Sequence, residues 1–156
     1  MYSQEHYEKS AATFSRSYQP IDAIRGMPFS VGCAFKYLAR AGFKGDKLED
    51  LKKAHDYLND VLQFNVFEND NGDRLTEFAV TVEAMQAVYA FAKQNRHIHT
   101  LFNTFIEKHE KVYETESFLN EVNIYIRAVD LLECMSAVYE EIAYIEQDRA
   151  SDGHYE

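Results

Sequence analysis

Residues that interrupt helices are scarce in this chain. Its 156 residues include only six Gly and two Pro, and no Pro occurs after Pro28. Proline removes a backbone donor and fits poorly inside a helix, while glycine favours turns. Their scarcity after residue 28 therefore predicts an all-α fold with long helices.

Features that would indicate membrane insertion or secretion are also missing. No run of eighteen apolar residues is present, so no membrane-spanning helix is expected. The first residues lack a basic start followed by an apolar stretch, so no secretion signal is expected. The two cysteines, Cys33 and Cys134, lie on apolar helical patterns, which favours two buried thiols over a disulfide. These features predict a cytoplasmic protein.

Standard catalytic and metal-binding motifs are absent. The chain contains neither GxxxxGK[ST] nor GxGxxG, the loops that hold phosphates, and neither CxxC nor HExxH. His97 and His99 are two residues apart on a predicted helix and would point to different faces, so no metal site is predicted from histidines.

Charge is distributed unevenly along the chain. Residues 1–66 contain nine Lys and Arg against eight Asp and Glu, whereas residues 67–156 contain seven against eighteen. Binding of duplex nucleic acid without sequence preference needs a basic face, so the net charge of −10 argues against it. The near-neutral first part can still hold one phosphorylated small molecule. We therefore expect a nucleotide rather than a nucleic acid as partner.

The hydrophobic pattern of residues 1–67 predicts a helix-hairpin module. We expect a short helix from Ile21 to Gly26, a second from Pro28 to Ala41 and a third from Asp46 to about Phe67. Gly42 is placed to end the second helix, and Asp46 to cap the third. The intervening loop is short, so the second and third helices should pack antiparallel.

Residues 74–150 predict an acidic helical bundle, either as a second domain or as part of one continuous domain. Residues 68–73 have the composition of a linker, and two helices are expected over residues 75–92 and 98–113. Ser117 is placed to cap a long C-terminal helix that reaches about Arg149. Two apolar stripes on this helix predict one face toward the core and one toward a partner subunit in a homo-oligomer. The alternative is a larger intramolecular bundle that buries both.

Charged side chains that can bind phosphate gather on the predicted hairpin. Lys36 and Arg40 are four residues apart and share a helical face, and Lys44 lies in the turn that follows. Asp50 and Lys53 would lie opposite them, near the positive end of the third helix. These groups can converge on a phosphate. The alternative is a solvated, salt-bridged surface in which each pair contributes ~1 kcal/mol or less.

This segment resembles a small phage-encoded nucleotide kinase family. The resemblance spans residues 6–62 and rests on His6-Tyr7, Ile21, Ile24, Gly32, Lys36-Tyr37, Arg40-Ala41-Gly42-x-Lys44 and Asp50-Leu51-x-Lys53-Ala54-x-x-Tyr57. It implies transfer of a phosphoryl group from a nucleoside triphosphate to thymidylate or deoxyguanylate, a phage origin, oligomers, and a location in the cytoplasm of an infected host cell. The acidic part after residue 67 has no counterpart in that family.

The resemblance also implies roles for individual residues. In a kinase, Lys36, Arg40 and Lys44 would bind phosphates with Lys53 in support, and Tyr37 or His6 would contact the base or sugar. Asp50 or Asp22 would act as the catalytic carboxylate near Mg²⁺, which is expected only for a kinase. Two alternatives remain open. One is an effector whose acidic part mimics nucleic-acid charge and inhibits a host protein. The other is a sponge that sequesters a nucleotide without turnover.

Overall fold

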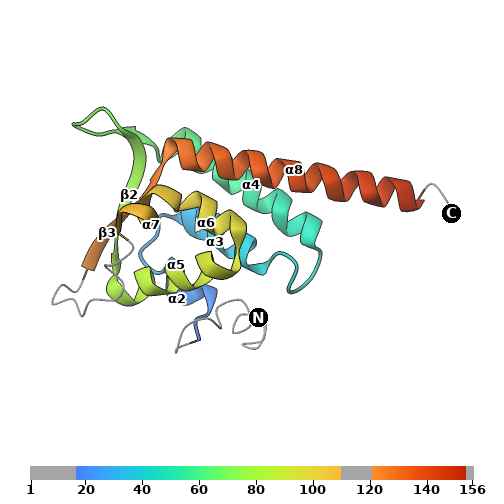
Figure 1. Cartoon of the computed structure of the whole chain (residues 1–156), viewed down its shortest axis with the longest axis horizontal. Coiled ribbons are helices and arrows are strands. Elements are labelled where there is room, and N and C mark those ends of the chain that lie inside the picture. The colour runs from blue at the N-terminus through green and yellow to red at the C-terminus, as the bar shows by residue number, and fades with distance from the viewer. Residues whose placement is uncertain (1–16, 110–120, 154–156) are drawn as a thin grey trace.

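The computed structural model describes residues 17–109 and 121–153. Figure 1 shows several helices gathered together, a small sheet at one end and a long C-terminal helix along one side. In chain order the elements are α2 (Pro20–Ile24), α3 (Phe29–Arg40), α4 (Lys47–Phe64), β1 (Phe67–Glu68), β2 (Arg74–Thr81), α5 (Val82–Gln94), α6 (Arg96–Leu101), α7 (Asn103–His109), β3 (Glu121–Arg127) and α8 (Ala128–Gly153).

The predicted helix hairpin is confirmed, although its second helix ends at Phe64 and Phe67 already belongs to β1. α3 ends at Arg40, and Gly42 follows with φ of 87°, a left-handed conformation that glycine adopts without a steric penalty. Asp46 is the N-cap of α4, and its side chain accepts hydrogen bonds from the backbone N–H groups of Leu48 and Glu49. α3 and α4 then pack against each other.

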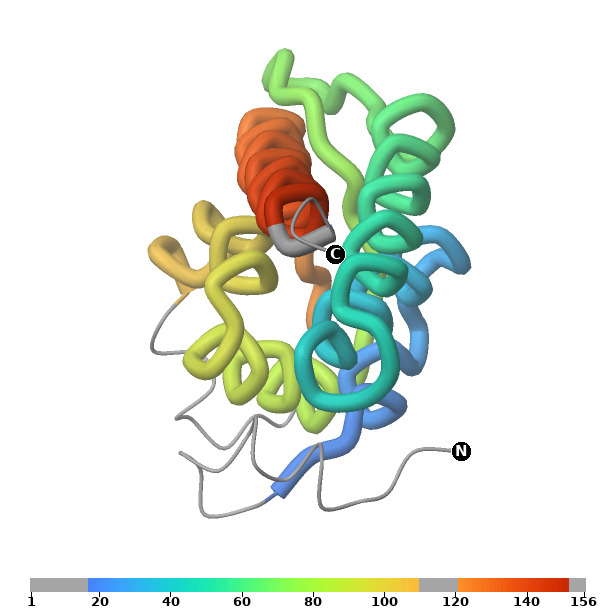
Figure 2. The backbone as a smooth tube through the Cα atoms, turned by 90° about the vertical axis from the view of Figure 1, so that its right-hand side faces the viewer, coloured from blue at the N-terminus to red at the C-terminus, as the bar shows by residue number. Residues whose placement is uncertain are grey.

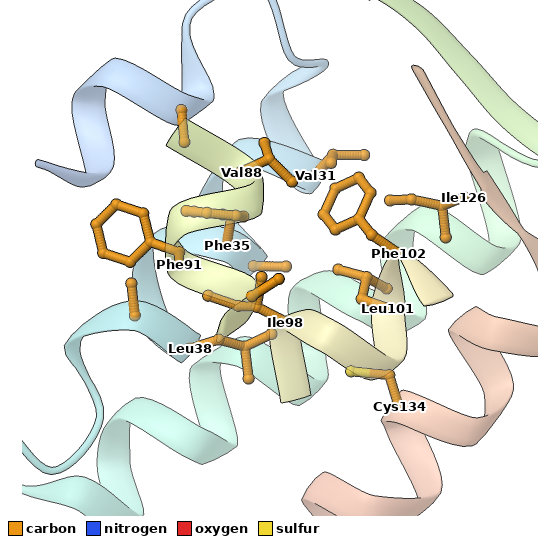
Figure 3. Packing of buried hydrophobic residues seen from close by; sticks show 14 of the residues in the cluster. Val31, Phe35, Leu38, Val88, Phe91, Ile98, Leu101, Phe102, Ile126 and Cys134 are labelled. Atoms are coloured by element: carbon orange, nitrogen blue, oxygen red, sulfur yellow. The ribbon is translucent and has the colours of Figure 1, made fainter. Parts of the chain in front are cut away.

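One hydrophobic core unites the hairpin with the rest of the chain. The ring of Phe35 on α3 meets Phe91 of α5 edge to face, with centroids 5.5 Å apart, and lies 6.4 Å from Phe102 (Figure 3). All three rings are fully buried. Leu51 of α4 and Leu131 of α8 belong to the same cluster. Residues from both predicted segments, 1–67 and 74–150, therefore share this core.

The all-α prediction is wrong, because the structure contains a three-stranded antiparallel sheet. The strand order is β1-β2-β3, and β2 pairs with β3 from Leu75 opposite Arg127 to Thr81 opposite Glu121. Of residues 68–73, predicted as a linker, Glu68 belongs to β1 and residues 69–73 connect β1 to β2. Within this turn the Asn69 side chain accepts hydrogen bonds from two backbone N–H groups, and Gly72 has φ of 81°.

The predicted helix over residues 75–92 is wrong in its first part. Side chains of β2 alternate between exposed and buried, with Thr76, Phe78 and Val80 turned inward. This period of two is that of a strand with one covered face. The helix begins only at Val82, where the Thr81 side chain caps it.

The later helices also differ from the predictions. The helix expected over residues 98–113 is divided at Phe102 into α6 and α7. The long C-terminal helix is shorter at its start, because residues 121–127 form β3, and longer at its end, where it continues to Gly153. Its 26 residues give a length of about 39 Å. The predicted cap, Ser117, lies outside the described residues.

Helix α8 packs along α4, as Figures 1 and 2 both show. Leu131 and Val138 are buried, which confirms the predicted inner stripe. Ion pairs reinforce the contact: Lys52 Nζ lies 3.2 Å from Glu146, and Arg149 Nη2 lies 3.0 Å from the helix-capping Asp46. Among the described residues, no helix has the length and apolar character needed to cross a bilayer.

Candidate ligand site on the α3–α4 seam

Most residues of the predicted site lie in one row where α3 and α4 pack together. We call this row the α3–α4 seam. Residues three or four apart share a helical face, so each helix presents one side of the row. The seam consists of Phe29, Ser30, Cys33, Lys36, Tyr37 and Arg40 on α3 and of Asp50, Lys53, Tyr57 and Asp60 on α4.

Tyr37 forms the centre of the seam. The ammonium groups of Lys36 and Lys53 lie 5.5 and 5.4 Å from the centroid of its ring, one from each helix. The ring of Tyr57 is nearly parallel to that of Tyr37, with an interplanar angle of 8° and centroids 6.0 Å apart. Two cations and two stacked rings therefore meet at one place on the surface.

Phe29 extends the aromatic row toward the start of α3. Its ring meets Tyr57 edge to face at 6.0 Å, yet 76% of the residue is exposed. Ser30 donates a hydrogen bond to the carboxylate of Asp60, which ties the two helices together here. The neighbouring Cys33 side chain and, to a smaller extent, burial raise the pKa of Tyr57 above its ordinary value. This end of the seam is aromatic and carries an exposed ring.

The opposite end of the seam is an ion pair. Arg40 Nε lies 3.2 Å from Oδ2 of Asp50, which is only 2% exposed. Burial raises the pKa of Asp50, while the positive charges of Arg40 and Lys53 oppose that rise. The Arg40 guanidinium also lies over Gly45, where a Cβ atom would come within 2.9 Å of Nη2. Arg40 and Asp50 thus form an ion pair with each other, as expected for the salt-bridged alternative at these two residues.

Not every residue of the predicted site joins the seam. Lys44 lies exposed in the turn between the helices. Asp22 lies on α2, where its Oδ2 accepts a hydrogen bond from the backbone N–H of Gln19 and caps that helix. His6 lies outside the described residues. The structure therefore brings together Lys36, Tyr37, Arg40, Asp50 and Lys53, and it adds Phe29 and Tyr57, to which the sequence analysis had assigned no role.

Asp50 and Asp22, either of which was expected near Mg²⁺ in a kinase, lie on different helices, and each already has a partner within the protein. Mg²⁺ requires oxygen ligands that can approach it in octahedral geometry. Asp50 is buried against Arg40, and Asp22 on α2 is engaged in capping its own helix. Within residues 17–109 and 121–153, no group of three or more His, Cys, Asp or Glu side chains is arranged to hold a metal ion.

A second polar cluster, centred on Glu141 of α8, was not predicted. Its Oε2 lies 2.7 Å from Lys47 Nζ, and its Oε1 lies 2.6 Å from His97 Nε2 and 3.1 Å from Arg96 Nη2. Burial alone would raise the pKa of Glu141, but the hydrogen bonds from Lys47 and His97 outweigh it and lower the pKa to about 2. The partners come from α4 and α6, so no local spacing in the sequence indicates this cluster.

Burial disfavours the charged form of His97 in this cluster. His97 is 5% exposed, and its Nδ1 has no hydrogen-bond partner. Burial lowers its pKa, although Glu141 opposes that effect. A neutral ring that donates from Nε2 to Glu141 and keeps Nδ1 unprotonated satisfies this geometry. The cluster joins α4, α6 and α8, which is a structural role.

The two cysteines also differ in their environment. Cys134 is buried, as predicted, and burial raises the pKa of its thiol to about 12. Cys33 is only partly buried, on the seam, and both thiols are free. An exposed, low-pKa thiol is what nucleophilic chemistry needs, and Cys134 has neither property.

Comparison with known proteins identifies a conserved-domain match in the same part of the chain. Residues 2–59 match a protein family of unknown function, DUF3310. The match covers α2, α3 and most of α4, and therefore nearly the whole seam. That family's description assigns it no activity. No curated protein and no solved structure matches the chain.

Proposed function

We propose that the α3–α4 seam binds a deoxynucleotide. In this proposal the phosphate lies between the ammonium groups of Lys36 and Lys53, and the base packs against the aromatic row that ends in the exposed ring of Phe29. The observation that carries the proposal is the convergence of two lysines from different helices on the single ring of Tyr37.

The contacts of Lys36 and Lys53 distinguish a ligand site from a solvated, salt-bridged surface. A salt-bridged surface would set a carboxylate against each lysine. Within the described residues, neither Lys36 nor Lys53 has a carboxylate oxygen within 4 Å, and both lie over a ring instead. Their positive charge is therefore available to an anion, and a phosphate satisfies several ammonium donors at once.

The aromatic residues give the site a second chemistry. Nucleobases stack on aromatic side chains, each contributing about 1–3 kcal/mol, whereas an inorganic anion gains nothing from such a ring. A ligand that carries both a phosphate and a planar base therefore fits the seam better than phosphate alone. The resemblance to phage nucleotide kinases points to thymidylate or deoxyguanylate, in the cytoplasm of an infected cell.

Phosphoryl transfer is the further step of this proposal. The seam supplies cations that would offset negative charge on the transferred group, and Arg40 is held in place by Asp50. Among the described residues, no group of three or more His, Cys, Asp or Glu side chains is arranged to hold a metal ion, so any Mg²⁺ would be bound mainly by the phosphates of the nucleotide itself. Binding without turnover would instead make the protein a nucleotide sponge.

Isothermal titration calorimetry with thymidylate and deoxyguanylate tests the binding. We expect Lys53→Gln to weaken binding about tenfold or more, since a charged hydrogen bond contributes about 1.5–3 kcal/mol. Lys52→Gln is the matched control, because Lys52 is the next residue along the helix and pairs with Glu146 on the other side of α4. Thymidine, which lacks the phosphate, should bind wild type and Lys53→Gln equally.

Incubation of the wild-type protein with a nucleoside triphosphate, Mg²⁺ and thymidylate then tests turnover. A diphosphate product that is lost in Lys36→Gln and Lys53→Gln supports the kinase. Tight binding with no product supports the sponge. Absence of binding by both deoxynucleotides contradicts the proposal and leaves the effector that inhibits a host protein.

A further inference from the structure

The outer face of α8 carries an apolar stripe that stays largely exposed in the described structure, although the ring centroid of Tyr139 lies 6.2 Å from that of His55 on α4. The stripe consists of Val129, Leu132, Ser136, Tyr139 and Ala143, all of them exposed. Val129, Leu132 and Tyr139 are 53%, 50% and 64% exposed, although α8 buries its opposite side against the core. The spacing alternates between three and four residues, which is the pattern of positions that meet a second helix in a coiled coil.

Acidic side chains border this stripe. Glu133 and Glu140 lie beside it, seven residues apart on the same flank, and both are exposed. Neither has an ion-pair partner among residues 17–109 and 121–153. Other glutamates of α8 differ in this respect, since Glu141 and Glu146 are paired with basic residues of the body. The flank of the stripe therefore carries two carboxylates without an ion-pair partner, although Arg96 lines the same surface hollow as Glu140.

We propose that the outer face of α8 docks an amphipathic helix of a partner protein that carries Lys or Arg beside its own apolar stripe. Small side chains at Ser136 and Ala143 leave room for larger apolar residues of the partner, and Val129, Leu132 and Tyr139 contact them. The flanking cations meet Glu133 and Glu140, at the positions that set partner choice in paired helices.

The stripe has the length of a short helical interface. Val129 and Ala143 are fourteen residues apart, which corresponds to about 21 Å along the helix axis. A partner helix of about two heptads would cover it. In contacts of this kind, apolar residues at helical spacing anchor the partner helix, and charged residues determine its orientation and selectivity.

A second copy of this chain is a poorer occupant. It would bring a second Glu133 and Glu140 to a flank that already carries two unpaired acids, and like charges disfavour pairing. The apolar stripe also ends at Glu146, which occupies the next position of the repeat. A basic helix removes the first mismatch, because its cations meet Glu133 and Glu140 in place of further acids.

Fluorescence anisotropy with the full chain and two labelled peptides tests this inference. Both peptides are stapled two-heptad helices with Leu on the apolar face, one with Lys and one with Glu at every flanking position. We expect saturable binding of the Lys peptide and at least about tenfold weaker binding of the Glu peptide. The double variant Glu133→Lys/Glu140→Lys should reverse this preference. The control Glu77→Lys/Glu107→Lys, with the same charge change on β2 and α7, should keep it.

Two results would overturn the inference. One is binding of the two peptides with equal affinity, or no saturation by the Lys peptide. The other is a stable dimer in sedimentation velocity that dissociates in Leu132→Ser/Tyr139→Ser, because the stripe would then be occupied by a second copy. The expected result is a protein without self-association through α8, in which this double variant weakens Lys-peptide binding.

Discussion

Two adjacent lysines of α4 lie on different sides of the helix and make different contacts. Lys52 faces α8 and lies 3.2 Å from Glu146, whereas Lys53 faces α3 and lies over the ring of Tyr37. Consecutive residues of a helix point in directions about 100° apart, so one residue in the sequence separates a structural contact from a candidate ligand site. Lysine type and local sequence alone do not distinguish these roles.

The seam and the outer face of α8 differ in the same way on a larger scale. Both expose aromatic side chains, but lysines accompany the rings of the seam and glutamates border the stripe of α8. The first arrangement suits an anion with a planar base and the second suits a basic helix. The two proposals thus assign ligands of opposite charge to the two surfaces.

The largest predicted effect concerns the core that both regions share. Phe35→Ala should destabilise the whole chain by about 3–5 kcal/mol, because its ring packs on Phe91 and Phe102 in a fully buried site. Urea unfolding followed by circular dichroism measures this. Phe29→Ala, at the exposed end of the seam, should change stability little. Equal effects would contradict the description of one core joined to an exposed seam.

The next prediction concerns the Glu141 cluster. Glu141→Gln should destabilise the protein by about 1–3 kcal/mol at pH 7, because Lys47 and His97 lose their charged partner. The pKa of Glu141 is about 2 in the folded state against 4.5 in the reference state, so its contribution is complete above pH 4.5 and declines below it. The difference in free energy of unfolding between wild type and Glu141→Gln should therefore become smaller as pH falls from 4.5 toward 3.

His97 adds a second pH effect. Its folded pKa lies below the reference value of 6.5, so its contribution to stability is present above pH 6.5 and is lost as pH falls. Unfolding curves between pH 8 and pH 3 measure both effects. Glu140→Gln, at the exposed neighbour, is the control, and a pH-independent difference between wild type and Glu141→Gln would contradict this account.

A smaller effect is expected at the turn beside Arg40. Gly45→Ala requires a left-handed conformation at a residue with Cβ and costs about 1–2 kcal/mol. The new Cβ also meets the Arg40 guanidinium at 2.9 Å, so ligand affinity should fall as well. Gly72→Ala has the same backbone cost at the β1–β2 turn, but there the nearest atom is 3.9 Å away. Loss of affinity in both variants would argue against a site on the seam.

The smallest effect is expected at the end of α8. Arg149→Ala removes the pair with Asp46 between two exposed side chains, and such pairs contribute little in water. No measurable change in the urea midpoint is expected. A clear loss of stability would mean that α8 depends on this pair more than on its apolar inner stripe.

The hairpin could be predicted because its signals are local. Gly42 and Asp46 mark the end of one helix and the start of the next, and the apolar residues before Gly42 and after Asp46 repeat at helical spacing. The sheet was missed because Leu75, Phe78 and Val82 also fit a helical spacing that continues into a real helix. The alternation of Thr76, Phe78 and Val80 and the Asn71-Gly72 pair were the available strand and turn signals.

The candidate site could be predicted in part for the same reason. Lys36, Arg40, Asp50 and Lys53 came from helical spacing and from the resemblance, and the hairpin brings them together. Phe29 and Tyr57 lie 28 residues apart, so only the packing of α3 on α4 shows that their rings meet. The partners of Glu141 are still more distant in sequence, and local patterns carry no information about them.

The most direct test of a ligand site on the seam is a titration of ¹⁵N-labelled protein with thymidylate, followed by amide chemical shifts. We expect saturable changes in amide chemical shift that are concentrated within residues 29–40 and 50–60. These changes should be lost in Lys36→Gln/Lys53→Gln but not in Lys52→Gln. Saturable shifts located elsewhere, or none at millimolar thymidylate, would contradict a ligand site on the seam.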